Sequence, residues 1–188
     1  MASFVTSNSK PLSGSIRVPG DKSISHRSII LGSIATGTTR VSGFLQGEDS
    51  LATLNAFKDM GVLIKRDGSD VTIQGVGMHG LNAPTKPLNL GNSGTSIRLM
   101  SGLLSAQSFD SELCGDESLS KRPMGRVIEP LRQMGADISG PDSMPPLSIN
   151  GGKNLSAIEY TMPVASAQIK SCILLAGLYS KGSTTVIE

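Results

Sequence analysis

The chain has 188 residues, with 17 lysines and arginines against 15 aspartates and glutamates, and its formal net charge is +2. So small a charge excludes a nucleic-acid binder that works by broad counterion release, and the lack of any apolar run of about 18 residues excludes a membrane-spanning helix. Two cysteines and two histidines, without metal-like spacing, predict no metal site and are typical of a reducing compartment. Since residues 1–10 lack the apolar core of a targeting segment, we expect a soluble, cytoplasmic protein.

The first part of the chain alternates between short strands and helices. Leu51, Leu54 and Phe57 lie on one face of a predicted helix, with Asp49 as its N-cap and Gly61 at its end. The expected elements are strands at 4–5 and 14–18, a helix at 22–35, a strand at 38–42, a helix at 50–60, and strands at 63–65 and 71–74.

This order of elements recurs in the rest of the chain. Ser23, Thr95 and Ala167 start equivalent helices at intervals of 72 residues, a period longer than that of solenoid repeats. The period therefore indicates repeated βαβαββ units, of which the third stops at Glu188, before its second helix. The later elements are expected as strands at 88–90, 109–114, 136–138, 147–149, 160–163 and 182–186, with helices from about 96, from about 126 and up to 178.

Polar and charged residues gather at the first of these helix starts. Free backbone N–H groups and the helix macrodipole favour an anion there. Lys22 adds a point charge, Ser23 a hydroxyl and Arg27 a planar fork that suits phosphate or carboxylate. One interpretation is a phosphate-handling site, and the other is an ordinary capped helix whose cations face solvent. Three-fold packing of the units would bring the three helix starts together into one anion site, whereas a duplication that serves folding alone would not.

Two further stretches could contribute to such a site. The run at 91–95 is not a dinucleotide fingerprint, but its glycines allow a ligand close to the backbone, and Asn92 and Thr95 add polar contacts. A Walker P-loop is excluded because Ile16 stands where that motif needs glycine. The segment 116–126 carries three cations, Lys121, Arg122 and Arg126, and a solvated charged loop is the commoner structure of such a run.

Four motifs, found in order along the chain, resemble those of the 5-enolpyruvylshikimate-3-phosphate (EPSP) synthase family. They are Pro-Gly-Asp-Lys-Ser-Ile-Ser-His-Arg at 19–27, Gly-Asn-Ser-Gly-Thr at 91–95, Lys-Arg-Pro-Met-Gly-Arg at 121–126 and Ala-Ser-Ala-Gln at 165–168. The third resembles the bacterial class II branch, which is often glyphosate-tolerant, and Leu99 stands where many glyphosate-sensitive members have proline. The UDP-N-acetylglucosamine enolpyruvyl transferase family shares the repeat architecture, but it usually has Lys-Asn where this chain has Lys22 and Ser23.

The resemblance implies an α/β (α+β) fold, an inside-out α/β prism of βαβαββ repeats around a pseudo-three-fold axis, truncated here in the third repeat. Residues 19–188 would be the N-terminal domain, incomplete, and residues 1–18 a strand segment of the second, C-terminal domain. The family transfers the enolpyruvyl group of phosphoenolpyruvate to the 5-hydroxyl of shikimate 3-phosphate and releases phosphate, a step of aromatic amino acid biosynthesis in the shikimate pathway. Both substrates are multiply anionic, which agrees with an anion site at the helix starts.

The resemblance also implies roles for individual residues. Lys22 would be catalytic, and glyphosate would occupy the phosphoenolpyruvate site. No metal or cofactor is implied. Shikimate 3-phosphate would be bound by Lys22, Ser23, Arg27, Ser166, Ala167 and Gln168, and phosphoenolpyruvate by Lys22, Asn92, Gly94, Thr95, Arg122 and Gln168.

The chain departs from the family in length. Family members continue into a C-terminal half that carries their acid–base Asp and Glu, and nothing in this chain matches that pair. General acid–base chemistry needs a carboxylate within hydrogen-bond reach of the reacting centre, so we expect catalysis only with a complementary C-terminal half, as in a split enzyme. The alternative is an inactive fragment that binds anions. In both cases the expected ligands are the two small substrates, and neither a nucleic acid nor a membrane is an expected partner.

Overall fold

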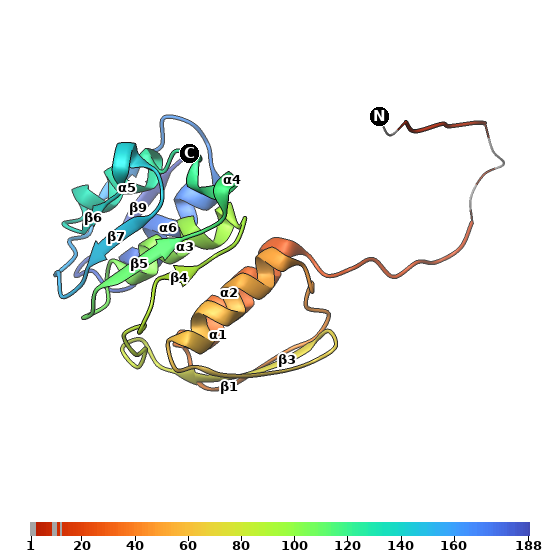
Figure 1. Cartoon of the computed structure of the whole chain (residues 1–188), viewed down its shortest axis with the longest axis horizontal. Helices are drawn as coiled ribbons and strands as arrows, with labels where there is room; N and C mark the ends of the chain where they lie inside the picture. The colour runs from red at the N-terminus through yellow and green to blue at the C-terminus, as the bar shows by residue number, and fades with distance from the viewer. Residues whose placement is uncertain (1–2, 9–10, 12) are drawn as a thin grey trace.

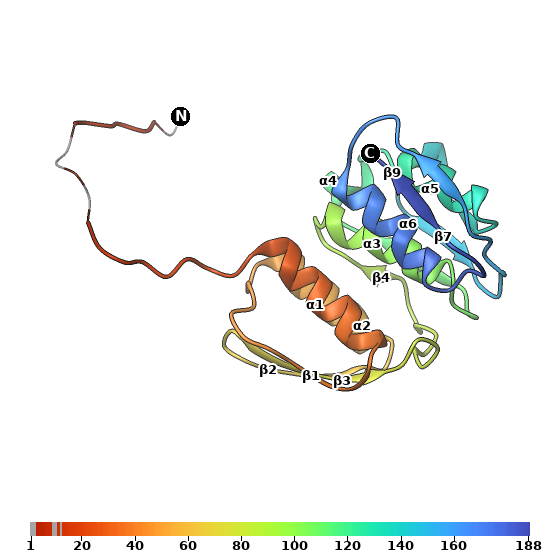
Figure 2. The same cartoon turned by 180° about the vertical axis from the view of Figure 1, so that it is seen from behind.

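The computed structural model describes residues 3–8, 11 and 13–188 of the chain (Figure 1). The folded part begins near Lys22, and the described residues before it form no helix or strand and extend away from the rest. The long helices lie on the inner side of the sheets, as two opposite views show (Figures 1 and 2). In the described ranges, no helix is long and apolar enough to cross a membrane.

The first unit packs two helices on one face of a three-stranded sheet. It consists of α1 (Lys22–Ile34), β1 (Thr36–Val41), α2 (Glu48–Asp59), β2 (Leu63–Asp67) and β3 (Asp70–Val76). β3 is the central strand, and β1 and β2 pair antiparallel on its two sides. The side chains of β3 that face the helices are fully buried or nearly so.

The second unit repeats this arrangement with one more strand. The strand order is β4-β5-β7-β6, in which β4 runs parallel to β5 and the other neighbours are antiparallel. Its elements are β4 (Leu88–Asn89), α3 (Gly94–Leu104), β5 (Ser111–Cys114), α4 (Glu117–Ser120), α5 (Gly125–Gln133), β6 (Asp137–Ser139), a 3₁₀ turn (Pro141–Ser143) and β7 (Leu147–Asn150).

The third unit contains β8 (Glu159–Thr161), α6 (Ala167–Gly177) and β9 (Thr185–Ile187), and its two strands are parallel. The strand pairing confirms the repeat that the 72-residue spacing predicts. The order β1-β3-β2 corresponds to β5-β7-β6, and the parallel pair β8-β9 corresponds to β4-β5. The fold is therefore mixed α/β, with one full unit between two partial ones.

The prediction of strands at 4–5 and 14–18 is wrong for the described residues. A strand needs a neighbour for its backbone N–H and C=O groups, and neither segment lies beside one. Phe4 is fully exposed and Ile16 is 89% exposed, so nothing buries their side chains. Residues 1–2, 9–10 and 12 lie outside the described residues, and the assignment of 1–18 to a second domain stays a prediction.

Two details of the helices also differ from expectation. The N-cap of α2 is Gly47, not Asp49, and it makes no side-chain cap hydrogen bond. The charged stretch after β5 is not simply a loop, because it contains the short helix α4, whose N-cap Asp116 accepts a hydrogen bond from the Leu119 amide at 2.7 Å. Gly61 follows the end of α2 with φ +89°, the left-handed conformation predicted for it.

The first helices of the three units, α1, α3 and α6, form the centre of the molecule. Ile29, Ile97 and Ile173, one from each helix, are completely buried. α2 contacts both α1 and α3, and α5 contacts both α3 and α6. α3 and α6 approach closely at Gly102, where a Cβ atom would lie 2.1 Å from the Cys172 carbonyl oxygen. This packing fixes the spacing of the helices whose starts carry the predicted site.

Candidate anion-binding site

The first turns of α1, α3 and α6 lie at the same end of the helix cluster. Gln168, the second residue of α6, donates to the hydroxyl of Thr95, the second residue of α3, at 2.9 Å. Arg27 of α1 donates to the Ser171 hydroxyl of α6 at 2.7 Å. The three-fold packing therefore brings the helix starts together. Each start has a side-chain cap: Asp21 accepts from Ile24 N at 2.7 Å, Ser93 from Ser96 N at 3.1 Å and Ser166 from Ile169 N at 3.4 Å.

The start of α1 is held against the loop after β1. A Cβ atom at Gly20 would lie 1.8 Å from the Gly43 carbonyl oxygen, so only glycine allows this approach of two backbones. The Ser25 hydroxyl accepts from Leu45 N at 2.9 Å and donates to the Asp21 carbonyl at 2.8 Å. The Pro-Gly sequence before the helix thereby sets where Lys22 lies.

Lys22 forms an ion pair with Asp49, which lies in the first turn of α2. The Lys22 side chain is 50% exposed and that of Asp49 25% exposed, so the ammonium group remains open to a ligand. The Ser96 hydroxyl also reaches the Asp49 carbonyl oxygen at 3.4 Å. The lysine is therefore supported by α2 and α3 as well as by its own helix.

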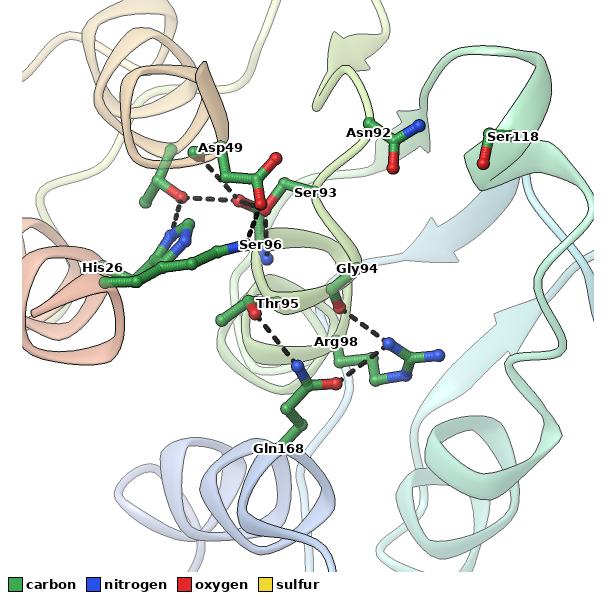
Figure 3. Close-up of polar contacts among 12 residues, drawn as sticks. His26, Asp49, Asn92, Ser93, Gly94, Thr95, Ser96, Arg98, Ser118 and Gln168 are labelled. Carbon is green, nitrogen blue, oxygen red and sulfur yellow. Dashed lines mark hydrogen bonds and ion pairs between the residues drawn. The ribbon is translucent and has the colours of Figure 1, made fainter. Parts of the chain in front are cut away.

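Gln168 connects α6 to α3 with both ends of its amide (Figure 3). Its nitrogen donates to Thr95, and its carbonyl oxygen accepts from Arg98 Nη1 at 2.9 Å. Arg98 Nη1 also donates to the Gly94 carbonyl at 3.1 Å. These bonds fix the orientation of Gln168 and hold a guanidinium beside the glycine-rich turn.

Arg122 approaches the same turn from the segment after α4. It donates to the side-chain carbonyl of Asn92 and lies 3.4 Å from the Ser118 hydroxyl. Asn92 in turn donates to Asp116 at 2.8 Å. Hydrogen bonds from the Leu119 amide and from Asn92 hold the pKa of Asp116 below its usual range, so this carboxylate stays ionised.

The guanidinium groups of Arg98 and Arg122 lie beside Gly94 at the start of α3, and that of Arg126 lies close enough to act on the charge of Arg98. Burial lowers the pKa of Arg98, and the positive charges of the other two lower it further. A Cβ atom at Gly94 would lie 2.8 Å from Arg98 Nη1 and 3.0 Å from Arg122 Nη1, so the glycine leaves room for both groups. Positive charge beside a helix N-terminus favours an anion. In the parts of the chain that the structure describes, no three His, Cys, Asp or Glu side chains lie together as a metal site.

The structure places all the predicted site residues at this end of the molecule but in separate hydrogen-bond networks. Lys22 belongs to the network of Asp49, and Arg122 to that of Asn92 and Asp116. The Ser166 hydroxyl caps α6. The site residues group by element as follows: Lys22, Ser23 and Arg27 in α1, Asn92 before α3, Gly94 and Thr95 in α3, Arg122 after α4, and Ser166, Ala167 and Gln168 at the start of α6.

Sequence reasoning missed Asp49 and Arg98 as site residues. Arg98 lies one turn after Gly94 and on the same face of α3. An arginine at this spacing from the glycine-rich turn could have been recognised from the sequence as a candidate site residue. Asp49 gave a misleading signal, because an acidic residue before an apolar run is typical of an N-cap. Its role depends on Lys22, which is 27 residues away in the sequence.

The sequence is similar to those of known proteins of one family. The sequence model of the family described as EPSP synthase (3-phosphoshikimate 1-carboxyvinyltransferase) matches residues 6–188. The chain is 64% identical over all its 188 residues to a 3-phosphoshikimate 1-carboxyvinyltransferase of Ruthia magnifica, and 56% identical over 183 residues to one of Streptococcus pyogenes serotype M1. It covers 43% of each of these proteins, so it spans less than half of their length.

Solved structures show the same similarity. The EPSP synthase of Acinetobacter baumannii superimposes with a TM-score of 0.90 and 62% sequence identity, over 93% of this chain and 40% of that one. The similarity in sequence and in structure therefore extends over 93% of this chain. The chain therefore belongs to the EPSP synthase family.

Proposed function

We propose that this chain is the N-terminal part of a 3-phosphoshikimate 1-carboxyvinyltransferase, a transferase that acts on phosphoenolpyruvate and shikimate 3-phosphate. The observation that carries the proposal is the convergence of three helix N-termini beside Lys22 and the guanidinium cluster of Arg98, Arg122 and Arg126. Positive groups concentrated in this way favour the binding of two multiply charged anions side by side. The free thiols of Cys114 and Cys172 agree with the proposed cytoplasmic location.

The proposed reaction forms a bond between the 5-hydroxyl oxygen of shikimate 3-phosphate and the enolpyruvyl carbon, and it breaks the bond from that carbon to the phosphate oxygen. Phosphate leaves with the electron pair, and the hydroxyl proton is released. Lys22 stabilises negative charge where the two substrates meet, since its ammonium lies at the start of α1. Gln168, fixed at both ends, orients the substrates relative to each other.

The two proposed binding sites are those that the family resemblance implies, and the arrangement of the helix starts supports them. The phosphate of shikimate 3-phosphate lies at the first turns of α1 and α6, near Ser23, Arg27, Ser166 and Ala167 with Lys22 and Gln168. Phosphoenolpyruvate lies at the start of α3, near Asn92, Gly94, Thr95 and Arg122 with the same two side chains. Three cations that are at least partly exposed would balance the negative charge of the two ligands: Lys22, Arg27 and Arg122.

The carboxylates near the site already have partners. Asp49 pairs with Lys22, and Asp116 accepts hydrogen bonds from Asn92 and Leu119. A general acid or base must be free to reach the reacting group. We therefore infer that the acid–base groups belong to a complementary C-terminal half.

An apolar groove between α1 and α6 supports such a partner. α2 lies between α1 and α3, and α5 lies between α3 and α6, but the described residues contain no helix between α6 and α1. A cavity of about 200 Å³ occupies that position, with Leu99 among its lining residues. At its rim Leu31, Leu174 and Leu178 are each about half exposed, 48%, 44% and 53%. Apolar surface of this kind is typical of a contact with further protein.

The test is an assay of phosphate release from phosphoenolpyruvate plus shikimate 3-phosphate. We expect no turnover by residues 1–188 alone, and turnover once a C-terminal half from a relative is added. Full turnover by the isolated chain would contradict the need for a partner. If a correctly folded partner binds without restoring activity, while shikimate 3-phosphate still binds, the chain is an inactive anion-binding fragment instead.

A further inference from the structure

A buried chain of hydrogen bonds joins α1, α2 and α3 behind the site (Figure 3). It starts at His26 in α1, whose Nδ1 lies 2.7 Å from the hydroxyl oxygen of Thr53 in α2. That oxygen lies 2.7 Å from the Ser96 hydroxyl, which lies 2.6 Å from the Ser93 hydroxyl. All four side chains are completely buried, so no solvent competes for these bonds. The chain ends at Ser93, the residue that caps α3.

The number of protons gives the chain one direction. Ser96 has a single hydroxyl proton, and the geometry directs it to Ser93 or to the Asp49 carbonyl oxygen. Ser96 must then accept the bond from Thr53, and Thr53, having given its own proton, accepts from His26. The imidazole therefore carries its proton on Nδ1 and leaves Nε2 bare. Nε2 is buried and has no partner in the described part of the chain.

The surroundings keep this ring neutral. Burial lowers the pKa of His26 to about 4, and the positive charges of Lys22 and Arg27 act in the same direction against the opposing Asp49 carboxylate. The groups that the start of α3 contributes to the hydrogen-bond network of the ring are the Ser96 and Ser93 hydroxyls, which are uncharged. A second proton would place a cation at a bare nitrogen that has no acceptor nearby.

We propose that His26 is a positioning residue, whose Nδ1 proton sets the direction of the hydroxyl chain and so orders the first turn of α3 at Gly94 and Thr95. The inference rests on the proposed function, because that turn is the one assigned to phosphoenolpyruvate. The Ser96 hydroxyl, a member of the same hydrogen-bond chain, also reaches the backbone carbonyl oxygen of Asp49, whose carboxylate pairs with Lys22. His26 thereby links the positions of the lysine and of the glycine-rich turn without touching a substrate.

The first test observes the proton directly, on residues 1–188 with ¹⁵N-labelled histidine. We expect ring-nitrogen NMR to show a protonated Nδ1 and a bare Nε2 on His26 from about pH 5.5 to about pH 8. His79, in the loop after β3, gives the reference resonances. A proton on Nε2 in the folded chain would reverse the direction of the bonds and overturn the inference.

The second test asks whether the proton matters for the site. His26→Leu removes the donor, whereas His26→Asn can keep an N–H group near the Nδ1 position. In the enzyme completed with a C-terminal half, we expect His26→Leu to raise KM for phosphoenolpyruvate about tenfold with kcat changed less, and His26→Asn to restore most of the loss. The matched control is Ser33→Ala, which removes another buried polar group of α1, a hydroxyl without a hydrogen-bond partner in the described residues.

Equal and small effects of His26→Leu and Ser33→Ala on KM would overturn the positioning role. If His26→Leu does not fold, Thr53→Val breaks the chain one step later and replaces it in the comparison. If the completed enzyme is inactive before any substitution, the proposed function fails, and the amide NMR shifts of Gly94 and Thr95 in the isolated chain decide the inference. Those shifts should change in His26→Leu or Thr53→Val and stay constant in Ser33→Ala, and the reverse result contradicts the inference.

Discussion

Gly102 of α3 lies so close to Cys172 of α6 that a Cβ atom at position 102 would stand 2.1 Å from the Cys172 carbonyl oxygen. The atoms that such a Cβ would clash with belong to the backbone of α6, so a change of side-chain rotamer cannot relieve the clash. This close approach of the two helices therefore requires a residue without a side chain at position 102. The contact therefore also limits how far Thr95, in the first turn of α3, can lie from Gln168, in the first turn of α6.

The Gly102→Ala variant tests this contact. Alanine in a helix interior usually adds about 1 kcal/mol over glycine, but forced separation of packed backbones costs about 1–3 kcal/mol, so we expect a net loss of stability. Urea unfolding followed by circular dichroism measures it. Gly125→Ala in α5 is the control, since its Cβ would meet only Ser143 at an ordinary 3.8 Å, and it should leave the free energy of unfolding unchanged or slightly higher. Equal stability of the two variants would contradict the close-contact argument.

Gly94→Ala should weaken the proposed phosphoenolpyruvate site without unfolding the protein. The new Cβ would lie 2.8 Å from Arg98 Nη1 and 3.0 Å from Arg122 Nη1, and these flexible side-chain ends can move away. Displaced guanidinium groups bind an anion less tightly, so KM for phosphoenolpyruvate should rise about tenfold in the completed enzyme. We expect the inhibition constant of glyphosate to rise as well. Unchanged values for both ligands would show that this position does not face them.

Lys22→Met should abolish turnover in the completed enzyme, by about a thousandfold or more, because an ammonium group that stabilises developing charge is lost. The fold should persist, since the Lys22–Asp49 pair is partly exposed and worth about 1 kcal/mol or less. Lys86→Met is the matched control, because Lys86 also forms an exposed ion pair, with Asp59 at 3.7 Å, but lies away from the helix starts. Comparable activity of the two variants would remove Lys22 from the mechanism.

The stability of the chain should fall between pH 7 and pH 4 because of His26. Its pKa is about 4 in the folded chain and 6.5 ordinarily, so the unfolded chain takes up a proton that the folded chain refuses. The contribution is complete above about pH 7 and is lost as the pH falls toward 4, by about 3 kcal/mol in total. Urea unfolding at about pH 7 and about pH 4.5 should show a smaller loss in His26→Asn than in the parent. Equal losses would mean that the ring titrates normally.

Local signals account for what the sequence predicts correctly. The helix starts at 22, 94 and 167 are each marked by a capping side chain, and Gly61 marks the end of α2, so these boundaries depend on neighbours within a few residues. The 72-residue spacing gave the topology, because similar units fold into similar sheets. The convergence of the helix starts follows from packing such units around one axis.

The remaining features depend on residues far apart in the sequence. The segment at 14–18 has the composition of a strand but no neighbour to pair with, so its pattern alone misleads. Arg98 and Asp49 acquire their places from Gln168 and Lys22, on other helices. The hydroxyl chain from His26 to Ser93 joins three helices and leaves no periodic trace in the sequence.

The first unit meets the rest of the molecule along one boundary. Hydrogen bonds that cross this boundary include Arg27 of α1 to Ser171 of α6 and Thr53 of α2 to Ser96 of α3. At its far end, Tyr179 Oη donates to the Met78 carbonyl at 2.9 Å. A unit attached along one boundary can open by itself before the whole domain unfolds, and amide hydrogen exchange detects that opening. An anion bound across the boundary selects molecules in which it is closed, so β2, which lies away from the site, should exchange more slowly when ligand is present. Ligand occupancy and cooperative unfolding are coupled in this way.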